Sequence, residues 1–214
     1  FIATLIIARV LEPAVYGDYV FLLASFTAVK SLTDFGTSQA FFTLMSQKFR
    51  GRSFILSYVT WQVFQFVLII SILGILFPRE WIEHIWLGED RSIVLLCFCA
   101  VFLQISAWQT MEHIAESFRR THQVQYLNIG IVATHFCLVV ILWIFNSLTK
   151  EVAFGLIILE YVLALGIAFP VLSLRSIEDN PFNLKETLEE YKVFCSPLIF
   201  LGGLSFCYQF ADRW

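Results

Sequence analysis

Charged residues are scarce in this sequence. Only 14% of its 214 residues are Asp, Glu, Lys or Arg, 58% are hydrophobic, and the mean hydropathy is +0.76. Soluble domains carry about 25% charged residues, which help to cover the surface around the core. So few charges cannot form a polar shell on a chain of this length. An ordinary soluble globular domain is therefore excluded, and we expect the excess apolar surface to face lipid.

Motifs for nucleic-acid binding and for catalysis are also missing. The net charge is −3, and no long run of Lys and Arg offers a surface to nucleic acid. The sequence contains no phosphate-binding Gly-rich loop, no His-Glu-x-x-His motif and no Gly-x-Ser-x-Gly motif. We therefore predict that the chain is not an enzyme, does not hydrolyse ATP and needs no cofactor.

The five cysteines indicate neither a metal site nor a disulfide framework. All of them fall within apolar stretches, where small buried thiols are expected. Cys97 and Cys99 form the only close pair, and they lack the ligand partners and the spacing of a zinc site.

Long apolar runs are what the sequence does contain. A membrane-spanning helix needs about 20 predominantly apolar residues, and the run from Val63 to Phe77 has no charge at all. Strands of a membrane barrel would instead alternate apolar and polar residues over about ten positions. Complete spans are predicted at 19–45, 53–77, 92–115, 123–145 and 152–174, and partial spans at 1–8 and 193–214. The predicted fold is an all-α, polytopic bundle of transmembrane helices, and because both ends lie within apolar runs we expect a fragment of a longer protein.

Basic residues in the connections predict the orientation, because Lys and Arg are retained on the cytoplasmic side. The connections 46–52, 116–122 and 175–192 hold three, two and three basic residues, whereas the alternate connections hold one, two and one. The first set is therefore assigned to the cytoplasm. Connection 175–192 is the longest and most polar, and its acidic run 186–190 could form a short amphipathic helix. We predict that it separates a first bundle, residues 1–174, from the start of a second, residues 193–214.

Several short motifs resemble those of one transporter family in their order and spacing. Ala8-Arg9-Val10-Leu11-Glu12-Pro13 with Tyr16-Gly17-Asp18-Tyr19 resembles the loop after the first helix of Wzx-type polysaccharide flippases, members of the multidrug/oligosaccharidyl-lipid/polysaccharide exporter superfamily. Asp34-Phe35-Gly36-Thr37 matches the Asp-hydrophobic-Gly signature of that family. The segments Leu184-Lys185-Glu186, Ser196-Pro197-Leu198, Gly202-Gly203-Leu204-Ser205 and Asp212-Arg213 resemble the start of its seventh helix. Glu12 departs from the family pattern, which has Gly before this Pro.

The resemblance implies a fold of two six-helix bundles facing a central cavity, of which this chain would hold the first and the start of the second. It also implies a flippase that moves a polyprenyl-diphosphate-linked oligosaccharide across the bacterial plasma membrane by alternating access. Its partners would be that lipid-linked substrate, the bilayer and other polysaccharide-export proteins. The alternatives are a drug or cation exporter of the same superfamily, a membrane-embedded polysaccharide polymerase or glycosyltransferase, and a purely structural membrane subunit.

Charged residues within the spans are the candidate functional residues, because a charge at mid-bilayer costs about 2.5–3.5 kcal/mol and normally faces a bundle interior or an aqueous cavity. Lys30 and Asp34 are four residues apart and share one helix face. Lys30 either attracts an anionic headgroup or forms an ion pair that lowers the insertion cost. Asp34 either contacts substrate or supports helix packing beside Gly36. By the resemblance, Arg213, next to Asp212, could bind a diphosphate bidentately.

Other polar residues of the spans leave similar alternatives. Glu112, Glu116 and Arg120 recur at every fourth position, either as a solvated helix end or as a cytoplasmic gate. Glu160 is either a protonated, hydrogen-bonded carboxyl or part of a proton relay. His135 is either a packing residue or a titrating switch.

Overall fold

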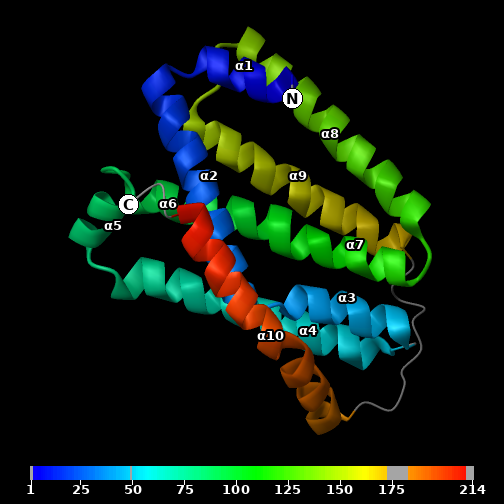
Figure 1. The fold of residues 1–214 in the computed structure, drawn as a ribbon. Coiled ribbons are helices and arrows are strands. Elements are labelled where there is room, and N and C mark those ends of the chain that lie inside the picture. The colour runs from blue at the N-terminus through cyan, green and yellow to red at the C-terminus, as the bar shows by residue number, and fades with distance from the viewer. Residues whose placement is uncertain (1, 49, 173–182, 211–214) are drawn as a thin grey trace.

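The described residues fold into helices and no strand. The computed structural model describes residues 2–48, 50–172 and 183–210 (Figure 1). The bounds are α1 Ile2–Val10, α2 Pro13–Asp34, α3 Thr37–Gln47, α4 Arg52–Ser71, η1 Ile72–Leu76, α5 Arg79–Ile85, α6 Arg91–Val101, η2 Phe102–Ala107, α7 Trp108–Ser117, α8 Thr121–Ile144, α9 Lys150–Val171 and α10 Leu184–Phe210. The two η segments are π-helical: η1 extends α4 to Leu76, and η2 joins α6 to α7 in one continuous helix.

Four of the continuous helices are long and apolar enough to cross a membrane. They are Arg52–Leu76, Arg91–Ser117, Thr121–Ile144 and Lys150–Val171, each within three residues of a predicted span. The α4 and α8 helices expose large apolar side chains along much of their length, such as Phe64 and Val132. An apolar helix that buries so little of its surface needs an apolar solvent. This agrees with the predicted all-α membrane protein.

The prediction of one uninterrupted span at 19–45 is wrong. α2 ends at Asp34, α3 begins at Thr37, and the two residues between them have left-handed backbones, with φ of 51° at Phe35 and 74° at Gly36. Left-handed residues end an α-helix, and glycine adopts this conformation without the steric cost that a Cβ would add. The chain therefore changes direction inside the predicted span.

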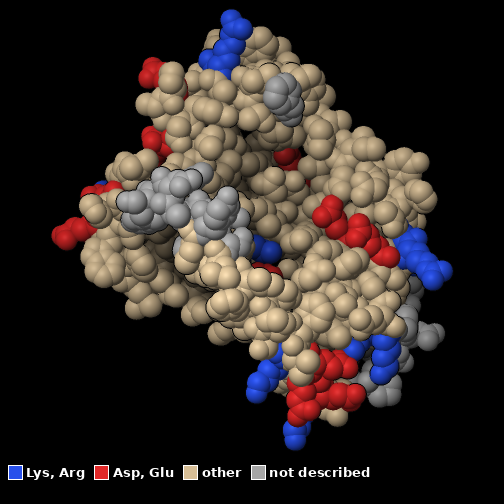
Figure 2. Space-filling view, in the orientation of Figure 1, with Lys and Arg blue, Asp and Glu red and all other residues tan. Residues whose placement is uncertain are grey.

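The connections meet at two opposite ends of the bundle, as their alternation along the chain predicts. At one end Ser46 lies 3.2 Å from Ser117, and Arg50 pairs with Glu190. At the other end Lys150 pairs with Glu89. On the face drawn in Figure 2, most charged atoms lie around the rim and the area between them is largely uncharged.

Aromatic packing holds the helices together between these two ends. The Phe26 ring stacks on Trp86 at 5.5 Å and meets Phe98 at 5.7 Å, and Tyr19 stacks on Phe154 at 4.9 Å. These contacts join α2 to α6 and α9 in the main buried cluster. All five cysteines are free, but Cys137 and Cys207 are exposed, so the prediction of buried thiols is wrong for these two.

The α10 helix starts inside the predicted connection 175–192 and lies against α2 and α3 (Figure 1). The acidic run 186–190 is helical, as expected, and continues directly into the apolar part of α10. The Leu198 side chain packs so closely on the α2–α3 break that a Cβ on Gly36 would lie 2.7 Å from the Leu198 Cβ.

Candidate functional site

The first candidate site is a polar cluster at the α2–α3 break. Lys30 lies on the last turns of α2, and its Nζ is 3.6 Å from Asp34 Oδ1, as their spacing of four residues predicts. The same Nζ donates to Gln109 Oε1 on α7 at 3.4 Å. Both charged side chains are largely buried, at 16% and 14% exposed. The Lys30 ammonium is thus held between a carboxylate and an amide contributed by two different helices.

Asp34 also caps the helix that follows the break. Its Oδ2 accepts hydrogen bonds from Ser38 Oγ at 2.7 Å and from the Ser38 backbone N at 3.4 Å. The first N–H groups of a helix have no partner within the helix, and a side-chain oxygen before them stabilises it. Asp34 therefore ties the end of α2 to the first turn of α3 across the break.

Glutamines from α4 complete this cluster. Gln65 Nε2 donates to the Thr33 carbonyl at 2.6 Å, next to the end of α2. Gln62 Nε2 donates to the Ser106 carbonyl at 3.3 Å, within the π-helical segment η2, and its Oε1 accepts from Thr110 at 3.0 Å. The gap enclosed by these groups measures about 10 Å³. This is room for about one water molecule, so the break cluster is closed in this conformation.

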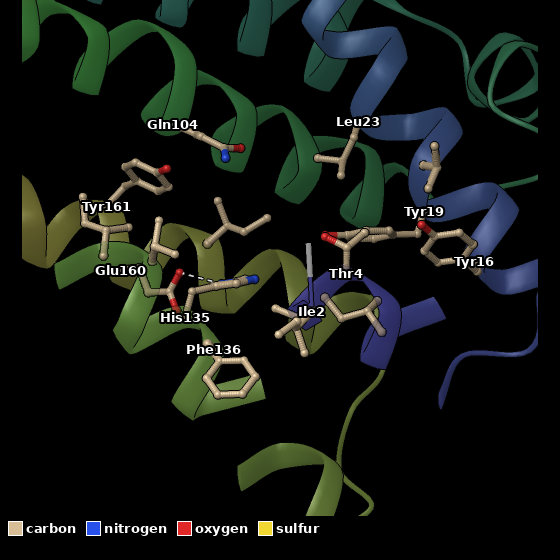
Figure 3. Close-up of a pocket in the computed structure, with 16 residues that line it drawn as sticks. Ile2, Thr4, Tyr16, Tyr19, Leu23, Gln104, His135, Phe136, Glu160 and Tyr161 are labelled. Carbon is tan, nitrogen blue, oxygen red and sulfur yellow. Dashed lines mark hydrogen bonds and ion pairs between the residues drawn. The ribbon is translucent and has the colours of Figure 1, made fainter. Parts of the chain in front are cut away.

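The second candidate site is a cavity of about 620 Å³ between α1, α2, α8 and α9 (Figure 3). Tyr16 and Tyr19 lie on one side of it and Tyr161 on the other, with Gln104 beside Tyr161. Most of the remaining lining is aliphatic. Unlike the break cluster, this cavity has space for part of a small molecule.

The His135 and Glu160 side chains meet at the wall of this cavity. His135 Nδ1 lies 2.9 Å from Glu160 Oε2, and the Glu160 side chain is only 3% exposed (Figure 3). The other carboxylate oxygen, Oε1, is buried and has no hydrogen-bond partner. A carboxyl group and an imidazole in contact can share or exchange one proton, and buried carboxylates in membrane proteins often serve this purpose.

The three gate candidates do not form one row. α7 ends at Ser117, Arg119 has a left-handed φ of 59°, and Arg120 donates to the Leu172 carbonyl at the end of α9. The expected spacing of Glu116 and Arg120 on one helix is therefore not realised.

Glu112 lies in a separate network, where its Oε1 accepts from Asn128 Nδ2 at 2.7 Å and Asn128 Oδ1 accepts from Trp108 Nε1 at 2.8 Å. It joins α7 to α8. Arg213 and Asp212 lie outside the described residues.

Sequence reasoning missed two features of these sites. It treated His135 and Glu160 separately, although they face each other across two helices. It also passed over Gln62, Gln65 and Gln109, although a polar amide within an apolar span is a signal of a buried network. Within the described part of the chain, no group of three or more His, Cys, Asp or Glu side chains could hold a metal ion.

Comparison of the chain with models of known protein families, with curated proteins and with solved structures finds no match.

Proposed function

We propose that the chain belongs to a transporter that flips a polyprenyl-diphosphate-linked oligosaccharide across a bacterial plasma membrane by alternating access. The substrate class comes from the resemblance to Wzx-type flippases. Under this proposal, residues 1–174 form the first bundle, and α10 is the first helix of the second. The connections 46–52, 116–122 and 175–192 then face the cytoplasm.

The observation that carries the proposal is the ion pair of Lys30 and Asp34 at a broken helix. Helices interrupted within a bundle are typical of secondary transporters, where the break supplies polar backbone and side-chain groups to the transport path. A buried ammonium is costly among apolar helices. That cost is offset here by Asp34 and Gln109, and in the transporting state a diphosphate would take their place.

The pair formed by His135 and Glu160 is the proposed coupling site. A proton on this pair neutralises the buried carboxyl group, and loss of that proton leaves a charge that favours a wetter conformation of the cavity. Proton movement could thereby drive the change between inward-open and outward-open states. Asp34 is the second coupling candidate, because its charge balances Lys30.

The test is complementation of a strain that lacks the transporter, using the full-length gene. Lys30→Ala should leave lipid-linked oligosaccharide on the cytoplasmic side and lower surface polysaccharide about tenfold or more, because the removed charge is buried. Lys30→Arg should retain part of the activity, and Lys48→Ala, at an exposed position, should behave like the wild type. Normal export by Lys30→Ala at wild-type protein level would exclude Lys30 from the transport path.

A cation exporter is the second candidate, and the composition of the larger cavity favours it. Among the described residues, Glu160 is the only carboxylate in the cavity lining and no Lys or Arg contributes to it, and the tyrosine rings could contact an organic cation. In this case Glu160→Gln should abolish efflux of cationic dyes from cells, whereas Lys30→Ala should spare it. For the flippase, Glu160→Gln should instead make polysaccharide export independent of the proton gradient.

A further inference from the structure

A groove of about 560 Å³ runs between α4 and the first two turns of α10, and it adjoins the break cluster through Thr37 and Tyr58. We call it the α4–α10 groove. Its walls are formed by Ser57, Tyr58, Thr60, Trp61 and Phe64 of α4, by Leu184, Thr187, Leu188 and Tyr191 of α10, and by Thr37. The two helices come from parts of the chain more than 100 residues apart, so only the fold creates this groove.

Many of the lining residues carry hydroxyl groups, yet the groove surface is apolar. The Ser57 hydroxyl donates to the Phe54 carbonyl at 2.7 Å, and the Thr60 hydroxyl donates to the Leu56 carbonyl at 2.8 Å. Thr37 likewise donates to the Asp34 carbonyl at 2.7 Å. These side chains therefore turn their polar atoms to the backbone and their carbon atoms to the groove. A sugar or a peptide would lose hydrogen bonds to water in such a groove, whereas a hydrocarbon chain would not.

The groove lies beside the charged beginning of α10. Leu184 and Leu188 are on its wall, and Lys185, Glu186 and Glu189 are exposed on the rest of the same turns. A helical segment with one apolar and one charged face lies at the boundary between headgroups and hydrocarbon. Phe64, at 54% exposed, belongs to the sparsely buried apolar face of α4. The groove thus runs from the level of lipid headgroups into the hydrocarbon region.

Two hydrogen-bond donors without partners lie at the headgroup end of the groove. The Arg50 guanidinium is 2.6 Å from Glu190 and stacks 4.8 Å from the Phe54 ring, which in turn lies 6.1 Å from the ring of Tyr191. Arg50 Nε and the Tyr191 hydroxyl are both buried and make no hydrogen bond. A buried donor without a partner is destabilising, and a phosphate group could satisfy both donors.

We propose that the α4–α10 groove binds the phosphate-proximal isoprene units of a polyprenyl phosphate lipid, with the phosphate displacing Glu190 from Arg50. This inference rests on the proposed function and adds to it the place where the lipid end of the substrate is held. A lipid with one chain is the occupant that a single groove fits, since a phospholipid with two chains would leave one of them outside. Arg50 suits the phosphate because a planar guanidinium can donate two parallel N–H hydrogen bonds to two phosphate oxygens.

The experiment measures binding of a long-chain polyprenyl phosphate to the purified full-length protein in detergent. Thr60→Trp fills the groove from an exposed position of α4, so it should weaken binding about tenfold or more. Val67→Trp is the matched control, because Val67 lies on the same helix, is 54% exposed and does not line the groove. Its affinity should equal that of the wild type. Excess phosphatidylglycerol should not displace the polyprenyl phosphate.

Each of the remaining outcomes of this experiment would contradict one statement of the proposal. Equal affinities of wild type and Thr60→Trp would place the lipid elsewhere, and displacement by phosphatidylglycerol would make the groove a general phospholipid site. If no variant binds polyprenyl phosphate at all, the proposed function fails together with the inference. If Thr60→Trp does not fold, photo-crosslinking of a polyprenyl phosphate analogue to the wild-type chain tests where the lipid binds. The crosslinked peptides should then come from residues 57–64 and 184–191.

Discussion

Asp34 makes two kinds of contact with the two oxygens of one carboxylate. Its Oδ2 holds the first turn of α3 through Ser38, and its Oδ1 faces the Lys30 ammonium. The cap needs only an oxygen acceptor, because it binds N–H and O–H groups. The ion pair needs the negative charge. These two roles can therefore be separated by substitutions that remove one and keep the other.

Asp34→Ala should destabilise the protein by more than about 1–2 kcal/mol, because it removes the side-chain bond to the first turn of α3 and also leaves the buried Lys30 ammonium without its counter-charge. Asp34→Asn retains an acceptor oxygen and should lose less stability, but it leaves Lys30 without its counter-charge and should impair export as strongly as Asp34→Ala. Unfolding midpoints in detergent, measured beside the export assay, test both statements. Glu12→Ala is the control, since Glu12 occupies the N-cap of α2 without making a side-chain cap bond. Equal stability of Asp34→Ala and wild type would contradict the capping role.

The elements show which parts of the structure hydropathy can predict. Four of the five complete spans correspond to continuous helices, because a long apolar run among lipid must satisfy its own backbone hydrogen bonds. The fifth, 19–45, fails at two residues. Hydropathy is averaged over a whole span, so it does not detect a change of φ at Phe35 and Gly36. The Asp-hydrophobic-Gly motif marks the place, but the motif alone does not reveal a break.

The sequence also does not predict which polar side chains of neighbouring helices meet. The contact of His135 with Glu160 depends on the rotation and the vertical register of α8 against α9, and neither is determined by the apolar pattern of two helices that are apolar all round. Each residue could be selected as polar within a span. Only the packed structure shows that the two form one site.

Gly36→Ala tests the tight contact between the break and α10. A left-handed backbone costs an L-residue about 1–2 kcal/mol, and crowding in a packed contact costs about 1–3 kcal/mol more. We expect both losses, because the added Cβ would meet Leu198 Cβ at 2.7 Å and Leu198 Cδ1 at 2.8 Å. The free energy of unfolding of the variant in detergent measures their sum.

A double-mutant cycle with Leu198→Gly separates these two costs. This second change removes all three contacting carbon atoms of Leu198, so the double variant should lose less stability than the two single variants together. Gly130→Ala is the control, because a Cβ there meets nothing within 4 Å and the residue lies within α8. Strict additivity of the two changes would mean that α10 does not rest on the break.

At the scale of the whole molecule, the charge count and the fold give the same grouping of connections. The segments after α3 and α7 meet at one end, where Ser46 lies beside Ser117, and the start of α9 reaches the segment after α5 through Lys150 and Glu89. The first group is also the richer in Lys and Arg. The fold fixes which connections share a side. The basic residues predict that this side is the cytoplasm.

Labelling of single cysteines in intact cells tests this orientation of the whole chain. After replacement of the five native cysteines, Lys48→Cys and Arg119→Cys should be protected from a membrane-impermeant thiol reagent, whereas Glu80→Cys and Ser147→Cys should react. All four positions are exposed in the fold, so protection reflects the membrane and not burial. Permeabilised cells provide the control, in which all four variants should react.

Because positions 48 and 119 lie at one end and positions 80 and 147 at the other, the two members of each pair must behave alike. A reversed pattern would invert the orientation, and a mixed result within one pair would contradict the membrane-spanning bundle itself.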